Sequence, residues 1–206
     1  TRRSSDLSVV FEIMEAVENI WSNRILRTLL VSAVVFVLLL LPFNYLIPVL
    51  VVDVYERETI AQGVLAGMFG FGSLLGAIKI AGLPNEAKRG LIFIASGIAS
   101  GFTLVLIAAT PVYWISIGFM LIMGVSFSSQ WSLIQIIIIS KVSSRLRGRV
   151  MSLLIMVFGL VPLGLFPIGF FIDMVGPRPV VATMGVIVLL FTVLILGSNK
   201  NFRSLQ

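Results

Sequence analysis

The sequence predicts an all-α membrane protein with six transmembrane helices. The prediction rests on long uncharged runs, high hydropathy and a one-sided distribution of basic residues. Of the 206 residues, 58% are hydrophobic and 12% are charged, and the mean hydropathy is +1.10. A hydrocarbon core of roughly 30 Å needs about 20 helical residues, so such a chain is not a water-soluble globule. Five runs contain no Asp, Glu, Lys or Arg: 28–52, 59–78, 90–140, 150–172 and 179–199.

The longest run, 90–140, is too long for one crossing, and Thr110-Pro111 divides it. Proline is tolerated in the first turn of a helix because its missing N–H would be unpaired there. Helices are expected because an unpaired backbone group in lipid costs several kcal/mol. The predicted spans are 28–52, 59–80, 90–109, 112–139, 150–172 and 179–197, preceded by a lead-in of residues 1–27 and followed by a tail of residues 200–206.

The basic residues predict the orientation of the spans. Thirteen of the 15 fall on one side: Arg2, Arg3, Arg24, Arg27, Lys79, Lys88, Arg89, Lys141, Arg145, Arg147, Arg149, Lys200 and Arg203. Only Arg57 and Arg178 fall on the other side. Because cytoplasmic loops are enriched in Lys and Arg, this bias predicts a multi-pass protein of the cell (inner) membrane with both chain ends in the cytoplasm.

The composition argues against several function classes. With no Cys and no His, the chain has no thiolate or imidazole metal site, no Cys nucleophile and no Ser–His triad, so we expect neither an enzyme nor a metal centre. The net charge of +6 reflects topology, and no nucleic-acid partner is expected. The bilayer is the expected partner, with the basic side suited to anionic headgroups.

The lead-in, residues 1–27, differs in kind from the spans. Its apolar residues fall on one side of a helical wheel, with Glu12 and Glu15 opposite. Membrane-surface helices are normally basic on the polar face. We therefore expect a cytoplasmic helix that packs against protein, or an ordinary solvated lead-in.

Two spans carry most of the polar residues. The first contains Pro42, Asn44, Tyr45 and Pro48, which predicts either a gate or substrate contact, or simply a kinked helix. In the fourth, Ser128, Trp131 and Gln135 follow one another at spacings of three and four residues, which places all three on the same face of a helix. Such a face is expected to line a bundle interior or a water-filled cavity, or to form interhelical hydrogen bonds.

The three residues Ser128, Trp131 and Gln135 thus form one polar stripe along the fourth span, which Gly124 extends by a further four residues. Together with Asn44 and Tyr45, they are our candidates for contact with a small-molecule substrate.

Glycine and proline patterns predict close packing in the second and fifth spans, because small residues let helix backbones approach each other. The second span has Gly63, Gly67 and Gly70 on one face and Gly72 and Gly76 roughly opposite, so we expect crowding on both sides. The fifth span, expected to be bent and closely packed, contains Gly159, Pro162, Gly164, Pro167 and Gly169. The third and sixth spans carry only scattered polar residues and are predicted to face lipid. This order hints at a three-plus-three inverted repeat.

Several motifs resemble a known family. The run 145–152, which contains Arg145, Arg147, Gly148 and Arg149, leads into a helix with Pro162-Leu163-Gly164 and Pro167-Ile168-Gly169. That helix ends in the outer-loop sequence 173–178, which contains Asp173, Gly176 and Arg178. Together with Gly70-Phe71-Gly72 and the lead-in 24–27, these motifs resemble the major facilitator superfamily, especially its bacterial macrolide-efflux and enterobactin-exporter-like branches.

The resemblance implies that the chain is the C-terminal half of a twelve-helix secondary transporter. Spans one and four would line a central cavity, spans two and five would face an N-terminal six-helix half, and spans three and six would face lipid. It also implies efflux of amphipathic small molecules by alternating access. The driving force would be an ion gradient, of protons, and no cofactor would be needed. The lead-in would belong to the linker between halves.

One connection departs from the family pattern. Residues 82–89 lack the Asp-Arg of the family's loop signature, so its ion-pair gating role does not carry over. No carboxylate lies inside a predicted span, which leaves these spans without an acidic proton carrier. Two alternatives stay open: a non-transporting membrane scaffold or sensor with the same fold, and a six-span protein that acts as a homodimer.

Overall fold

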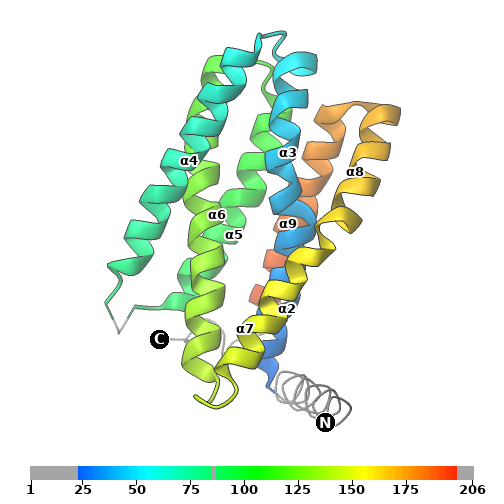
Figure 1. Cartoon of the computed structure of the whole chain (residues 1–206). Coiled ribbons are helices and arrows are strands. Elements are labelled where there is room, and N and C mark those ends of the chain that lie inside the picture. Colours follow the sequence, from blue (N-terminus) through cyan, green and yellow to red (C-terminus); the bar gives the residue numbers. More distant parts are fainter. Residues whose placement is uncertain (1–22, 85–86, 199–206) are drawn as a thin grey trace, which may run out of the picture.

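The computed structural model describes residues 23–84 and 87–198, with no description of the side chains of 196–198. The predicted lead-in helix before Asn23 and the tail 200–206 lie outside the described residues. Every regular element in the described part is helical, and six helical segments are long and apolar enough to cross a membrane (Figure 1). The predicted fold class and span order are confirmed.

The first span begins earlier than predicted, at Arg24. Asn23 caps it: its Oδ1 accepts hydrogen bonds from the backbone N–H groups of Ile25, at 3.0 Å, and Leu26, at 3.4 Å. The prediction began the span where the charged residues end. The helix extends past that point because basic side chains at a helix end can reach toward headgroups while their stems cover apolar surface.

The first span is irregular along its length. It consists of α2 (Arg24–Val35), a π-helical turn (Phe36–Leu40), α3 (Leu41–Val49) and a second π-helical turn (Leu50–Val54). Pro42 and Pro48 lack the N–H that an α-helix would donate to the fourth preceding carbonyl. The predicted kinked helix is therefore present as two changes of helical pitch.

The remaining spans follow the predicted order. They are α4 (Thr59–Ala81), α5 (Arg89–Ala109), α6 (Tyr113–Lys141), then α7 (Arg147–Met156) with α8 (Val161–Val175), and α9 (Pro177–Ser198). A 3-10 turn, Val157–Leu160, separates α7 from α8. It lies just before Pro162, and the fifth span bends there as predicted (Figure 1).

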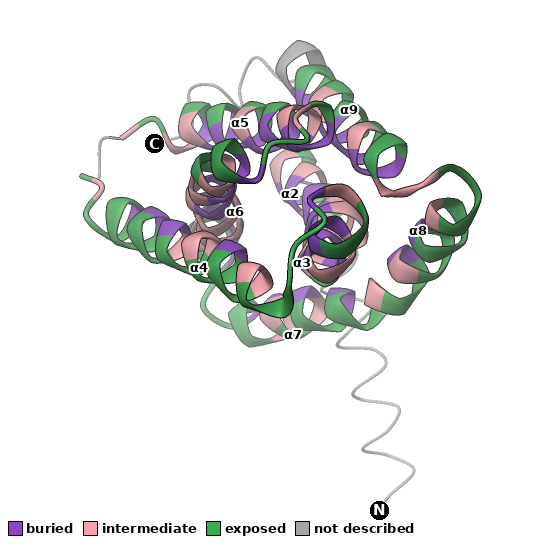
Figure 2. Ribbon diagram, turned by 90° about the horizontal axis from the view of Figure 1, so that it is seen from above, coloured by how far each residue is buried: buried purple, intermediate pink, exposed green. Residues whose placement is uncertain are grey.

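The helices pair in a pattern that relates the first three spans to the last three. The second span, α4, packs on the fourth, α6, while the fifth, α8, packs on the first at its π-helical turn. The third and sixth spans, α5 and α9, pack on each other along one edge of the bundle (Figure 2). If spans one, two and three are exchanged with spans four, five and six, the same set of pairs results. A three-plus-three repeat requires this symmetry.

Glycines form the tightest of these contacts. A Cβ at Gly76 would lie 2.5 Å from the backbone oxygen of Val125, and one at Gly72 would clash with the backbone of Leu121. From the other helix, a Cβ at Gly124 would clash with the backbone oxygen of Phe69. Close backbone approach therefore joins α4 to α6.

The expectation of crowding on both sides of the second span is wrong for this chain. Gly63, Gly67 and Gly70 have no atom within 4 Å of a hypothetical Cβ, so their face of α4 is open. In the fifth span Gly164 is tightly packed, because a Cβ there would lie 2.5 Å from the Leu38 oxygen. At Gly159 and Gly169 a Cβ would have no atom within 4 Å. Spacing identifies small faces, but neighbouring helices decide which are covered.

The third and sixth spans, predicted to face lipid, each have one exposed apolar face. Phe102 on α5 and Leu194 on α9 are exposed, whereas the polar residues of these helices mostly point inward. A Cβ at Gly101 would lie 2.9 Å from the Gly185 oxygen, and one at Gly185 would lie 2.7 Å from the Gly101 oxygen. The buried polar residues on this pair are Ser96, Ser100, Thr103 and Thr192.

The basic residues of the described part gather at one end of the bundle. Figure 1 places the start of α2, the end of α4, the start of α5 and the α6–α7 connection at the same end. Arg57 and Arg178 lie at the opposite end, in the connections after the first and fifth spans. The one-sided charge distribution is therefore a property of the folded bundle.

We expect Gly124→Ala to destabilise the protein by about 1–3 kcal/mol, because the added methyl group forces two backbones apart. The matched control is Gly118→Ala in the same helix, where a Cβ has nothing within 4 Å and no loss is expected. Thermal unfolding of the complete gene product in detergent measures the difference. Equal stability of the two variants would contradict the close-contact interpretation.

Candidate functional site

An aromatic cluster joins four spans around Trp131. The Trp131 ring stacks on Phe36 of the first span at 5.3 Å between centroids and meets Phe158 of the fifth edge-on at 4.9 Å. Phe36 also lies 4.4 Å from Phe127, which contacts Phe69 of the second span at 5.3 Å. Aromatic pairs at these separations attract beyond their burial of area. Trp131 therefore sits where the spans predicted to carry the polar residues converge.

The other two residues of the predicted stripe, Ser128 and Gln135, are partly buried on α6. Gly124, at the end of the stripe, instead packs against α4. The three side chains thus present a hydroxyl, an indole and an amide on a partly accessible helix face.

The two candidates on the first span lie farther along the bundle. Asn44 is partly buried and its Nδ2 donates to the Leu41 oxygen of its own helix at 3.4 Å. Tyr45 is 59% exposed. They follow Phe36 by eight and nine residues, which corresponds to roughly 12 Å along a helix. The structure therefore arranges the five candidates as a long strip, with Trp131 as the member in contact with other spans.

The sequence analysis did not select Gln130, which is the most deeply buried amide described. Its exposed fraction is 6%, and its Oε1 has no hydrogen-bond partner among the described residues. A signal was present in the sequence: Ser126, Gln130, Leu133 and Ile137 repeat the spacing of four, three and four on the opposite face of α6. That second face points into the bundle.

Two tyrosines form hydrogen bonds at the end of the bundle opposite most of the basic residues. Tyr55, 6% exposed, donates its hydroxyl proton to the Ser116 Oγ at 2.7 Å, which ties the end of the first span to α6. Tyr113 donates to the Ala61 oxygen at 3.1 Å, and the Arg57 guanidinium lies 5.9 Å from its ring centroid. Burial raises the pKa of Tyr55 above its ordinary value, so this hydroxyl stays a donor well into the alkaline range.

The outer-loop motif has a structural function at Arg178. Its Nε donates to the Ala108 oxygen at 2.8 Å and its Nη2 to the Ala109 oxygen at 3.0 Å, so the guanidinium caps the end of α5. A cation is favourable there because the helix dipole places partial negative charge at the C-terminus. Gly176, with φ of +84°, makes the reversal between α8 and α9 that brings Arg178 to this position. Asp173 is exposed.

The motif in the run 145–152, which joins the fourth and fifth spans, caps a helix in the same way. The Arg147 Nε donates to the oxygen of Val142, the cap residue that follows α6, at 3.2 Å. Ser152 donates its hydroxyl proton to the Gly148 oxygen at 2.9 Å. Arg145 is exposed and Arg149 is partly buried. Arg147 therefore links the fifth span to the end of the fourth, and Arg178 links the sixth span to the end of the third.

Comparison with known proteins adds a family and two relatives. The family model described as Major Facilitator Superfamily matches residues 3–164. Macrolide efflux protein A of Streptococcus pyogenes is 25% identical over 177 residues, which cover 84% of this chain and 44% of that protein. The protein of the same name from Streptococcus pyogenes serotype M6 matches to the same extent. The chain thus spans less than half the length of these relatives, and no solved structure matches it significantly.

We expect Arg178→Ala to lower stability by about 1 kcal/mol, since two charge-assisted hydrogen bonds at an exposed helix end are lost. Arg178→Lys should give a smaller loss, because an ammonium keeps the charge but not the planar fork. Thermal unfolding measures both, and hydrogen exchange should become faster in the last turn of α5. Unchanged exchange there in the alanine variant would argue against a capping function.

Proposed function

The chain belongs to the major facilitator superfamily, and from that premise we propose that it forms the C-terminal half of a twelve-helix exporter of amphipathic small molecules. The family makes it a multi-pass membrane transporter. The further steps of the proposal are the division into halves, the direction and class of substrate, and the cytoplasmic placement of the basic end in the cell membrane.

The incomplete burial of two spans carries the half-transporter proposal. In the most apolar stretch of the second and fifth spans only 22% of the residues are buried, against 50% or more in the first, third and fourth. On the second span the open face contains Gly63, Gly67 and Gly70. A glycine face gains little from lipid chains but permits close approach by another helix. An N-terminal six-helix half is the proposed occupant.

The strip on the first and fourth spans supports the substrate class. Trp131, Phe36 and Phe158 offer aromatic surface, while Ser128 and Gln135 offer a hydroxyl and an amide on the same side of α6. Sites for small molecules combine apolar walls with a few polar groups that fix orientation. The names of the relatives, which describe macrolide efflux, agree with a large amphipathic substrate.

Alternating access would then rock this bundle against the other half around the strip. The glycine contacts and arginine caps described above favour movement of the six helices as one body. The energy source in this proposal is a proton gradient, without a cofactor. Since none of the described spans has an acidic residue in its apolar interior, the proton carrier is assigned to the other half.

A homodimer is the second candidate, because a second copy of the chain would cover the same open glycine face. The two candidates differ in the number of spans in one gene product. A complete reading frame with only six spans, together with a dimeric mass in detergent, would replace the half-transporter proposal by the homodimer.

The transport proposal is tested with the complete gene product in liposomes. We expect an imposed pH gradient to drive movement of a macrolide or a lipophilic dye, and we expect an ionophore that collapses the gradient to abolish it. Protein-free liposomes are the control for leakage of these apolar compounds. Absence of gradient-dependent flux across a broad panel would favour the scaffold or sensor alternative.

We expect Trp131→Ala to change the relative transport rates of different substrates by about tenfold, the effect of losing roughly 1.4 kcal/mol of aromatic contact. Trp114→Ala is the matched control, because Trp114 lies on the same helix but is 71% exposed. Transport of several compounds is measured for each variant and normalised to the amount of protein. A uniform loss with reduced protein would assign Trp131 to packing.

A further inference from the structure

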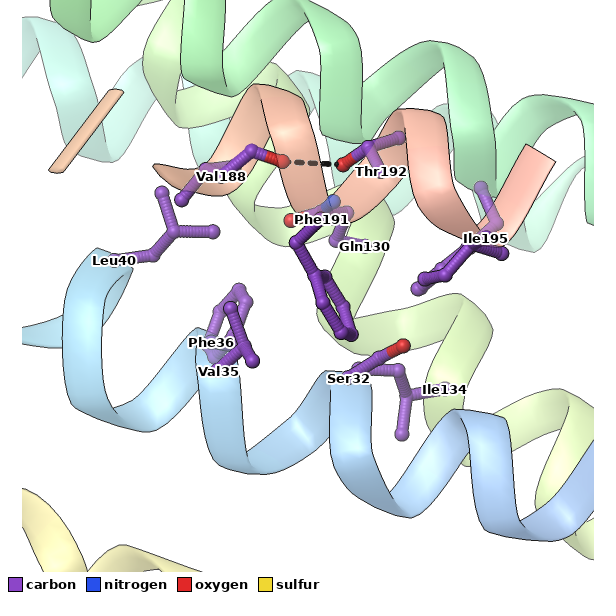
Figure 3. Close-up of a pocket in the computed structure, with 11 residues that line it drawn as sticks. Ser32, Val35, Phe36, Leu40, Gln130, Ile134, Val188, Phe191, Thr192 and Ile195 are labelled. Atoms are coloured by element: carbon purple, nitrogen blue, oxygen red, sulfur yellow. Dashed lines mark hydrogen bonds between the residues drawn. The ribbon is translucent and has the colours of Figure 1, made fainter. Parts of the chain in front are cut away.

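A small cavity lies inside the six-helix bundle, and none of the five candidates for substrate contact lines it. Its polar lining residues are Ser32 on α2, Gln130 on α6 and Thr192 on α9 (Figure 3). The space open to the centres of water-sized spheres is about 20 Å³. A cavity needs roughly 10–15 Å³ by this measure to hold a water molecule. The cavity therefore has room for one molecule of that size.

The cavity lies where the two hydrophobic clusters of the bundle meet. Phe36, Leu40 and Val188 belong to the cluster nearer the tyrosine end. Phe93, Ile134 and Ile195, on the other side of the cavity, belong to the cluster nearer the basic end. Polar side chains from three spans thus interrupt the apolar core at one level.

Three oxygen atoms at the cavity have unused capacity to accept a hydrogen bond. Gln130 Oε1 is buried without a hydrogen-bond partner among the described residues. The Ser32 hydroxyl donates its proton to the Thr28 oxygen at 2.7 Å, and the Thr192 hydroxyl donates to the Val188 oxygen at 2.8 Å. Each hydroxyl has its single proton committed, so what remains on both oxygens is acceptor capacity.

Close packing holds the Gln130 amide in position. A Cβ at Gly97 on α5 would lie 2.7 Å from both Gln130 Nε2 and Thr192 Oγ1. The amide therefore fills the space above a glycine and is confined from that side. A buried acceptor without a donor costs about 1–3 kcal/mol, which gives an occupant of the cavity a clear energetic benefit.

We infer that this cavity binds one water molecule, which donates a hydrogen bond to Gln130 Oε1 and a second to a hydroxyl oxygen of Ser32 or Thr192. Buried waters in proteins typically satisfy such groups through two to four polar partners. Water fits better than a monovalent cation, because the rest of the lining is apolar and no charged side chain lines the cavity. The inference does not depend on the proposed transport function.

The site also lies beside a helical irregularity. Val35, Phe36 and Leu40 line the cavity and flank or form the first π-helical turn. The water would join the first span at this turn to the fourth and sixth spans. Such a link ties the irregular span to the rest of the bundle at the level where apolar packing is interrupted.

A crystal structure of the complete gene product in lipid, at a resolution that shows ordered water, tests the inference. We expect one peak at about 2.7–3.0 Å from Gln130 Oε1. It should persist in crystals grown with choline in place of sodium and show no anomalous signal in crystals grown with rubidium. A missing peak, or one with a rubidium signal, would overturn the water assignment.

Two variants sharpen this test. Gln130→Leu removes the unpaired acceptor, so we expect the peak to disappear while the helices keep their positions. Ser96→Ala is the matched control, because Ser96 is a buried hydroxyl that bonds to the Phe93 oxygen and does not line the cavity. The peak should be retained in that variant. Retention of the peak in Gln130→Leu would also contradict the inference, and the wild-type crystals decide the matter if that variant does not fold.

Discussion

Close contact between helix backbones at glycine is the interaction on which the rest of this structure depends. Lipid chains are as apolar as leucine, so burial of apolar side chains does little to hold helices together in a bilayer. Contact must come from backbones near enough to interact directly. Gly72, Gly76 and Gly124 provide this between α4 and α6, and Gly101 and Gly185 provide it between α5 and α9. Because these pairs are fixed, the partly accessible face of α6 and the buried face opposite it are fixed as well.

A related constraint explains why Ser96, Ser100, Thr103 and Thr192 of the third and sixth spans turn inward. In hydrocarbon, a polar side chain without a partner is costly. Ser100 and Thr192 each donate to a backbone oxygen of their own helix, four residues earlier. This satisfies the proton without an interhelical partner and leaves space for bulky apolar residues on the outer face. The arginine caps at Ala108, Ala109 and Val142 solve the related problem of helix ends, where carbonyl oxygens lack intrahelical donors.

Sequence reasoning located the helices well because the absence of charge over about 20 residues is a local property of the chain. It placed the start of the first span too late, because basic residues at a helix end do not stop the helix. It selected Trp131, which contacts two other spans, as a candidate for substrate contact, but it missed Gln130, since both residues lie on polar faces of one helix with the same spacing. Only the neighbours on other helices, Gly97 and Thr192, distinguish the buried face. The open and covered glycines of α4 could not be separated for the same reason.

Two of the uncovered surfaces of the described bundle differ in a way that bears on what covers each. The outer faces of α5 and α9 expose bulky side chains such as Phe102 and Leu194, which fill space against disordered acyl chains. The open face of α4 also exposes bulky side chains such as Phe71 and Leu74, but it differs by the glycines Gly63, Gly67 and Gly70 that lie among them. At these glycines a second helix can bring its backbone close, and van der Waals contact grows steeply with that approach. The open face of α4 is thus the better suited to protein, whether that protein is another half of the same chain or a second copy.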